Sequence, residues 1–158
     1  MGLNKRKRKN YYRRNKSNIF LFCFLIIVAY LSFYFDLFQT VNVTIDFHIK
    51  ILTINSVFAG FLFTSLGIMI SILDKERIAK LDKAGYMDNY INAIYIGLFF
   101  HVFSISMSLI LIIIPRVDVY GFFTKTEQIT LFMGVAFFVK SIINVLQIIR
   151  MVRPGWGK

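Results

Sequence analysis

Two side chains that can carry a positive charge, Lys140 and His101, lie inside long stretches of apolar residues. A lysine at the centre of a membrane-spanning helix costs about 2.5–3.5 kcal/mol, and such residues often mark ion or substrate pathways. Counting along the apolar stretches brings both residues to a similar depth, with Tyr30 and Thr64 at about the same level. We therefore predict one intramembrane polar layer, which consists of Tyr30, Thr64, His101, Lys140 and Asn144.

Three interpretations of this layer are open. The first is a pore or binding site at Lys140 and His101, which would favour anions because the apolar stretches contain no acidic residue. The second is a hydrogen-bonded layer that only packs the helices together. The third is that the long stem of the lysine extends toward the interface and carries the ammonium group out of the apolar region.

The sequence contains no recognisable set of catalytic or metal-binding residues. It has no glycine-rich phosphate loop, no cysteine and histidine spacing typical of a metal site, and no serine, histidine and acid that could be placed together. All eight acidic residues lie outside the apolar stretches, which leaves an enzyme in the membrane without a general base. We therefore expect a protein with no enzymatic activity, no metal and no cofactor.

The elements that must position these residues are transmembrane helices. Hydrophobic residues make up 57% of the 158 residues and charged residues only 17%, which is too few to cover a soluble domain. Four stretches are long enough to cross roughly 30 Å of hydrocarbon as helices, which satisfy their own backbone groups in lipid. We predict an all-α bundle of four transmembrane helices at 19–38, 51–73, 91–114 and 129–149, within a membrane domain at 19–149.

The basic residues predict how this bundle is oriented. Fifteen of them lie in three segments that four spans place on one side, namely the arm 1–18, the hairpin 74–90 and the tail 150–158. Only three lie in the other two loops. By the positive-inside rule, both termini are therefore cytoplasmic, and we expect the protein in a bacterial plasma membrane.

The N-terminal arm is strongly basic and contains no acidic residue. Its basic residues are Lys5, Arg6, Lys7, Arg8, Lys9, Arg13, Arg14 and Lys16. Such an arm could bind nucleic acid, with Tyr11 and Tyr12 stacking on bases. Because it directly precedes a transmembrane helix, we expect it to bind anionic lipid headgroups of the bilayer and no nucleic acid.

Small residues recur on one face of the second and third predicted helices. The two sets are Ser56, Gly60, Thr64, Gly67 and Ser71, and Ala93, Gly97, His101, Ser104 and Ser108. In lipid, small side chains let helix backbones approach closely. We predict that the two stripes pack against each other with Gly60, Gly67 and Gly97 at the contact. The alternative is that one stripe faces another subunit.

Two connecting segments also carry a pattern. Residues 41–50 alternate between apolar and polar, which is typical of a half-buried strand, and we interpret them as an extended connector. The middle loop, 74–88, resembles a continuation of the second helix. It forms either a solvated tip or a docking surface for a cytosolic partner.

Four short helices in a small chain resemble the small multidrug exporters. Those exporters exchange protons for cationic drugs at a glutamate in the first helix, and 19–38 contains no glutamate, so we do not assign that family. We expect a non-enzymatic scaffold, sensor or defence-type subunit of a larger assembly, partnered by copies of itself or by another membrane or cytosolic protein. The alternative is a homo-oligomeric pore or small transporter built around Lys140 and His101.

Overall fold

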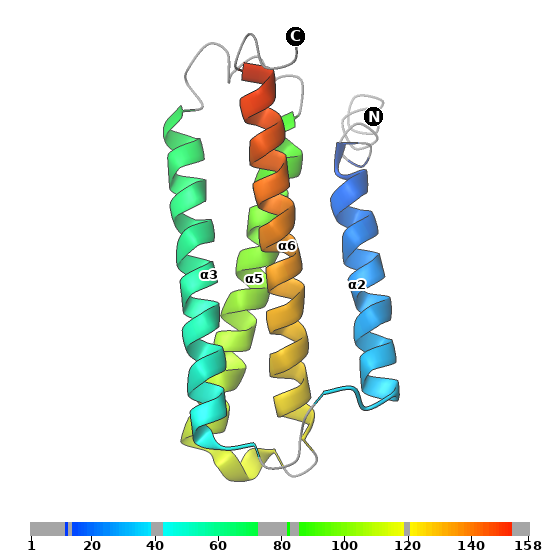
Figure 1. The fold of residues 1–158 in the computed structure, drawn as a ribbon, viewed down its shortest axis with the longest axis vertical. Helices are drawn as coiled ribbons and strands as arrows, with labels where there is room; N and C mark the ends of the chain where they lie inside the picture. The colour runs from blue at the N-terminus through cyan, green and yellow to red at the C-terminus, as the bar shows by residue number, and fades with distance from the viewer. Residues whose placement is uncertain are drawn as a thin grey trace, which may run out of the picture.

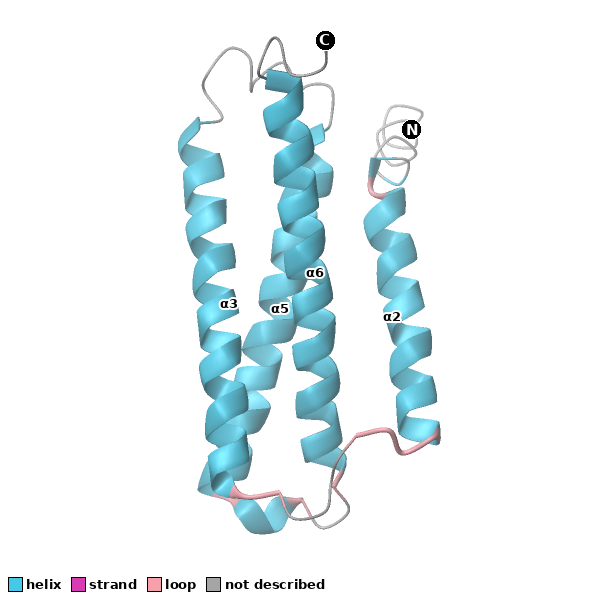
Figure 2. Cartoon of the chain, viewed as in Figure 1, coloured by secondary structure: helices cyan, strands magenta, loops and turns pink. Residues whose placement is uncertain are grey.

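Four long helices run side by side in this protein (Figure 1). The computed structural model describes residues 12, 14–38, 43–72, 82, 86–118 and 121–152. The helices are α2 (Lys16–Tyr34), α3 (Ile45–Ile72), α5 (Tyr86–Ile113) and α6 (Phe122–Val152), with a short 3-10 turn, η1, at Pro115–Val117. No described residue forms a strand (Figure 2). Each helix is long and apolar enough to cross a membrane, which confirms the prediction of an all-helical chain with four candidate spans.

Helices α3, α5 and α6 form a packed core, and α2 stands beside it (Figure 1). We call the end where α2 begins and α6 ends the upper end, and the opposite end the lower end. One buried apolar cluster joins the three core helices and includes Leu62, Met69, Met87, Tyr90 and Ile148. A second cluster brings in α2 through Leu25, which packs with Ala93, Phe100, Met133 and Phe137. Within α2, only Asn18, Leu25 and Ser32 are buried, so α2 is the peripheral helix.

All four helices begin earlier than the charge pattern predicted, and α3 and α6 differ from it most. α3 starts at Ile45, so residues 45–50 are helical and do not form the predicted extended connector. His48, Ile51 and Asn55 are buried at spacings of three and four, which only a helix places on one face. α6 starts at Phe122, seven residues before the predicted 129, and this brings an acidic residue into the helix. The predicted extension of the second helix over 74–88 lies largely outside the described residues.

The end of α2 also differs from the prediction, because the helix stops before residue 38. Asp36 adopts a left-handed conformation with φ 53°, which ends the helix. The backbone N–H of Leu37 then donates to the carbonyl of Ser32 (3.1 Å), and that of Asp36 to Phe33 (3.4 Å), as in a Schellman motif. The Asp36 carboxylate lies 2.5 Å from Lys125 Nζ, so this turn is tied to the start of α6.

The two small-residue stripes do not face each other, contrary to the prediction. A Cβ atom added at Gly60 or Gly67 would meet no other atom within 4 Å, so neither glycine lies at a helix contact. Gly97 does lie at one, since a Cβ there would come within 2.9 Å of Leu62 and 3.3 Å of Phe137. The partner of the α5 stripe is therefore α6, together with the opposite, large-residue face of α3.

Hydrogen-bonding demand explains which face of α3 turns inward. Ser56 Oγ and Thr64 Oγ1 donate to carbonyls of their own helix, at 2.8 and 2.9 Å. A hydroxyl can therefore face lipid without losing its partner. The imidazole of His48 and the amide of Asn55 each have more than one polar atom, and a bond within the helix satisfies only one of them. In lipid, the remaining polar atoms need partners on other helices.

Candidate functional site: a buried polar network

A buried carboxyl group connects the three core helices in the lower half of the bundle. Glu127 of α6 is 0% exposed. Its Oε2 lies 2.7 Å from Nδ1 of His48 on α3, and the hydroxyl of Ser108 on α5 donates to its Oε1. One side chain is therefore bound from both neighbouring helices.

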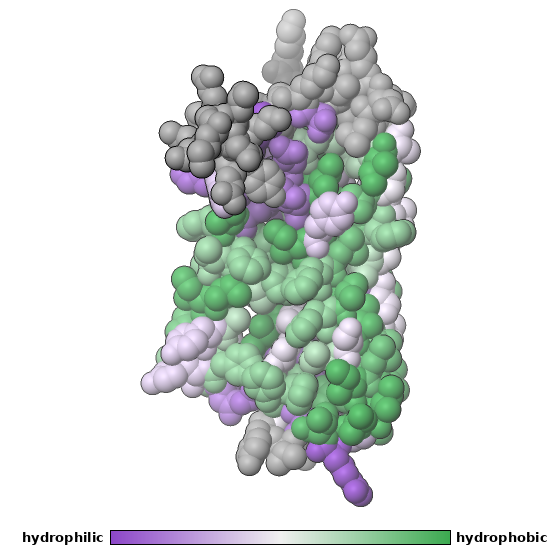
Figure 3. All heavy atoms as spheres, turned by 180° about the vertical axis from the view of Figure 1, so that it is seen from behind, coloured by the Kyte–Doolittle hydropathy of each residue, from purple (hydrophilic) through white to green (hydrophobic). Residues whose placement is uncertain are grey.

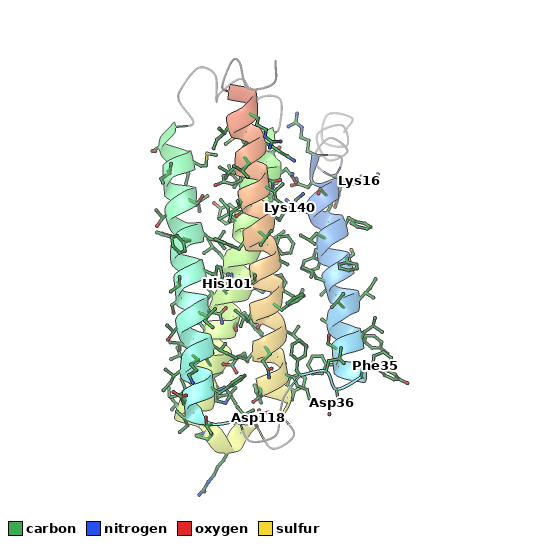
Figure 4. The ribbon with its side chains drawn as sticks, viewed as in Figure 1. Lys16, Phe35, Asp36, His101, Asp118 and Lys140 are labelled. Carbon is green, nitrogen blue, oxygen red and sulfur yellow. The ribbon has the colours of Figure 1, made fainter. Side chains whose placement is uncertain are left out.

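The network continues from this carboxyl group toward the middle of the bundle. Ser104, one turn from Ser108, donates to the backbone carbonyl of Glu127 at 2.9 Å. Asn55 Nδ2 donates to Ser104 Oγ at 2.9 Å, and Asn55 Oδ1 lies 2.7 Å from His101 Nδ1. The network, which consists of His48, Glu127, Ser108, Ser104, Asn55 and His101, thus runs from near the lower end to the mid-height position of His101 (Figure 4).

His101 is held by three neighbours, Gly134, Phe58 and the hydrogen-bonded Asn55. Its ring covers Gly134 of α6, where a Cβ atom would lie only 2.7–2.9 Å from three ring atoms. The ring of Phe58 on α3 stacks on it with centroids 5.4 Å apart and an interplanar angle of 12°. Nε2 is buried and has no hydrogen-bond partner among the described residues. Gly134 is therefore required by close approach, since any side chain would displace the imidazole.

Local sequence features position these residues. His48 and Asn55 are seven residues apart in α3, as are Glu127 and Gly134 in α6, so each pair shares a helix face. Asp118 caps the start of α6, because its carboxylate accepts hydrogen bonds from the backbone N–H groups of Phe123 (2.9 Å) and Thr124 (3.0 Å). The cap sets where α6 begins and places Glu127 one turn inside it.

The structure does not gather the predicted polar layer into one site. Tyr30 is 69% exposed on α2, and Thr64 is exposed on α3. Asn144 is buried near the upper end, with Nδ2 3.4 Å from the carbonyl of Asn89. Of the five predicted residues, only His101 belongs to the network. The predicted depths of these residues rest on counting from the ends of the uncharged stretches. Because the helices begin and end at other residues, those depths are wrong.

Lys140 bonds to α2 and lies apart from His101. Its Nζ donates to Ser17 Oγ at 2.6 Å, beside the first residue of α2. Figure 4 shows Lys140 in the upper part of α6, between the levels of His101 and Lys16. The ammonium group is therefore bound near the upper end and is not joined to His101.

Glu127, His48 and Asn55 are not among the site residues predicted from the sequence. Glu127 falls two residues before the predicted start of the fourth helix, and His48 falls in the alternating segment. The expectation that no acidic residue lies within a span is wrong, since the candidate span Phe122–Arg150 includes Glu127. The seven-residue spacing of His48 and Asn55 was the signal that could have found the α3 side of the network.

A second polar cluster lies at the upper end and contains mainly asparagines. Asn18 Nδ2 donates to the carbonyl of Asn89 at 2.7 Å, and Asn92 Nδ2 donates to Asn15 Oδ1 at 2.8 Å. Arg14 pairs with Asp88 at 3.3 Å. These bonds tie the first turn of α2 to α5. Of the eight basic residues in the predicted lipid-binding arm, only Arg14 and Lys16 lie within the described residues.

The chemistry available to the core network is proton exchange and hydrogen bonding. Imidazole, carboxyl and hydroxyl groups can each give and accept a proton, and such chains serve as proton relays in membrane proteins. Within the described residues, no group of three histidine, cysteine, aspartate or glutamate side chains could hold a metal ion. No known protein family, curated protein or solved structure matches the chain.

Proposed function

We propose that this protein is a non-enzymatic membrane subunit that assembles with another transmembrane helix through the small-residue face of α3. This face comprises Ser56, Gly60, Thr64, Gly67 and Ser71. The observation that carries the proposal is that nothing lies within 4 Å of a Cβ atom added at Gly60 or Gly67. Two helices in lipid associate best where small residues let their backbones approach, so this face suits a partner helix.

The rest of α3 supports the same assignment. Its opposite face already holds His48, Asn55 and Leu62 in the core, so the polar network and the small-residue face use different sides of one helix. Within the described residues, the hydroxyls of Ser56, Thr64 and Ser71 on the small-residue face bond to their own helix. A partner helix would be accepted without breaking any bond of the core. The protein then acts as a scaffold or sensor subunit of a larger assembly.

Photo-crosslinking in the native host tests this assembly. A benzoylphenylalanine at position 64 should give an adduct, and the mass of the adduct distinguishes a second copy from a different subunit. Ile54 is exposed on the same helix but lies about a third of a turn from Gly60, so the probe at position 54 is the matched control. An equal yield at both positions, or no adduct at position 64, contradicts the proposal.

The proposal includes an orientation with both termini in the cytoplasm. Its support is the distribution of basic residues, fifteen on one side against three on the other. A reporter fused after Lys158 should therefore report the cytoplasm, and one fused after Val117, between α5 and α6, should report the outer side. The reverse pattern would invert the bundle and move the lower end of the polar network to the cytoplasmic side.

A second candidate function, a small proton-linked transporter, is favoured by one specific observation. Glu127 is a fully buried carboxyl group bound to His48, and such groups in membranes commonly serve proton movement. Liposomes that contain the purified protein and a trapped pH dye test this function directly. Proton flux that disappears in Glu127→Gln supports a transporter. If the unaltered protein gives no more flux than empty liposomes, it is not a proton transporter, and the network has a structural or sensing role.

A further inference from the structure

A pocket of about 350 Å³ lies between α2 and α5 near the upper end. This volume is at the lower end of the range for small-molecule sites. Its upper part is lined by Asn15, Asn18 and Asn92, and its deeper part by Phe22, Tyr95 and Ile96. Polar residues therefore come first and apolar residues follow toward mid-height, in the order that a phospholipid presents a headgroup and then its tails.

Asn18 supplies a buried polar side chain to the upper part of the pocket. It is only 1% exposed, and its Nδ2 donates to the carbonyl of Asn89. Its Oδ1 is itself enclosed, with less than 1 Å² of accessible surface. Asn18 therefore ties α2 to α5 beside the pocket and meets an occupant through the rest of its side chain.

The basic side chains around the pocket favour an occupant with a negative charge. Lys16 is exposed beside the asparagines, and Lys140 reaches Ser17, which precedes Asn18 in the chain. Arg14 lies just before α2 and is paired with Asp88. Figure 3 shows hydrophilic side chains gathered near this end, above a broad hydrophobic surface. An anionic headgroup is therefore attracted to this end.

We infer that this pocket binds an anionic glycerophospholipid of the phosphatidylglycerol class. The phosphate lies toward the basic side chains, and an acyl chain lies against Phe22 and Ile96. Neither phosphatidylcholine nor phosphatidylethanolamine has a net negative charge. This site goes beyond the proposed assembly role, because it lies on α2 and α5 and does not involve the small-residue face of α3.

Native mass spectrometry of the purified full chain, exchanged into detergent with defined lipids, tests the inference. Palmitoyl-oleoyl phosphatidylglycerol should be retained at one molecule per chain. It should bind about fivefold more tightly than the matching phosphatidylethanolamine or phosphatidylcholine, since one basic group near the surface contributes about 1 kcal/mol. A large excess of water-soluble glycerol phosphate should not displace it, because the acyl chain contributes to binding. Equal retention of the three lipids, or displacement by glycerol phosphate, overturns the inference.

Two variants and a matched control locate the site. Asn18→Asp adds a negative charge beside the phosphate and should lower phosphatidylglycerol retention about tenfold, whereas Ile96→Trp fills the apolar part and should abolish it. The control, Ala29→Trp, fills a second pocket of about 200 Å³ between α2 and α6 and should leave retention unchanged. Wild-type retention in both site variants overturns the assignment, and so does a loss confined to the control. If Ile96→Trp does not fold, Asn18→Asp decides the outcome.

Discussion

His48 and Glu127 lie 79 positions apart in the sequence, and their side chains meet at 2.7 Å in the helix core. Glu127 is 0% exposed and His48 only 6%. Either group alone would be costly to bury in an apolar bundle, whereas together they satisfy each other. Because Ser108 binds the second carboxyl oxygen, the pair also connects α5 to α3 and α6 at the lower end.

Removing the carboxyl group should destabilise the fold. In Glu127→Leu, both His48 and Ser108 lose their buried partner, and we expect the free energy of unfolding to fall by about 3 kcal/mol. Glu127→Gln keeps a group that can bond to both, so its cost should be about 1 kcal/mol. Unfolding by titration with sodium dodecyl sulfate in mixed micelles measures these changes. The double variant Glu127→Leu/His48→Leu should lose less than the sum of the two single variants, and strict additivity contradicts the pairing.

The number of helices could be predicted from the sequence because lipid imposes a simple length rule. An uncharged, apolar stretch of about 20 residues is typical of a transmembrane helix. The structure contains four helices that fit such stretches. The helix ends could not be predicted from charge alone. Asp36 ends α2 through its backbone conformation, and Asp118 begins α6 through a side-chain cap. Neither feature is visible as a change in hydrophobicity.

The candidate site was harder to predict, since a polar side chain in a helix can be satisfied in several ways. Thr64 bonds to its own helix, Lys140 extends along its stem to Ser17, and Glu127 is bound by two other helices. All three interrupt an apolar pattern. Which of them is buried depends on the rotation of each helix about its axis, and that rotation is decided by contacts between residues far apart in the chain.

The glycines of α3 and α5 should respond oppositely to the same substitution. Gly97→Leu forces a large side chain between Leu62 and Phe137, and we expect a loss of about 2 kcal/mol in unfolding free energy. Gly60→Leu meets open space, so the fold should be unchanged or slightly more stable, because leucine favours a helix more than glycine does. Unfolding titrations of the two variants measure the contrast. A large loss in Gly60→Leu would place that face inside the fold.

Lys140 should matter little for the stability of the core. In Lys140→Met the bond to Ser17 is lost, but the group is partly exposed and its removal leaves no buried charge behind. We expect the unfolding free energy to change by less than about 1 kcal/mol, as for other exposed polar contacts. Ser17→Ala is the matched control and should give a similar result. A loss of several kcal/mol in Lys140→Met alone would indicate a buried partner for the ammonium group.

The contact between His101 and Gly134 makes the sharpest test of the network. In Gly134→Ala the new methyl group would overlap the imidazole ring, which cannot move away because Phe58 stacks on it and Asn55 binds it. We expect a loss of about 2 kcal/mol in unfolding free energy, which is typical of overpacking a core.

Removing the ring should then relieve the overlap. In His101→Ala the space above Gly134 is open, so adding Gly134→Ala to that variant should cost almost nothing more. The coupling between the two positions, measured by a double-mutant cycle, should be at least about 1 kcal/mol. Gly67→Ala, where no atom lies within 4 Å, is the control for the general effect of replacing a helical glycine. Equal effects of Gly134→Ala with and without the imidazole would mean that His101 does not contact α6. The mid-height end of the network would then differ from the one described.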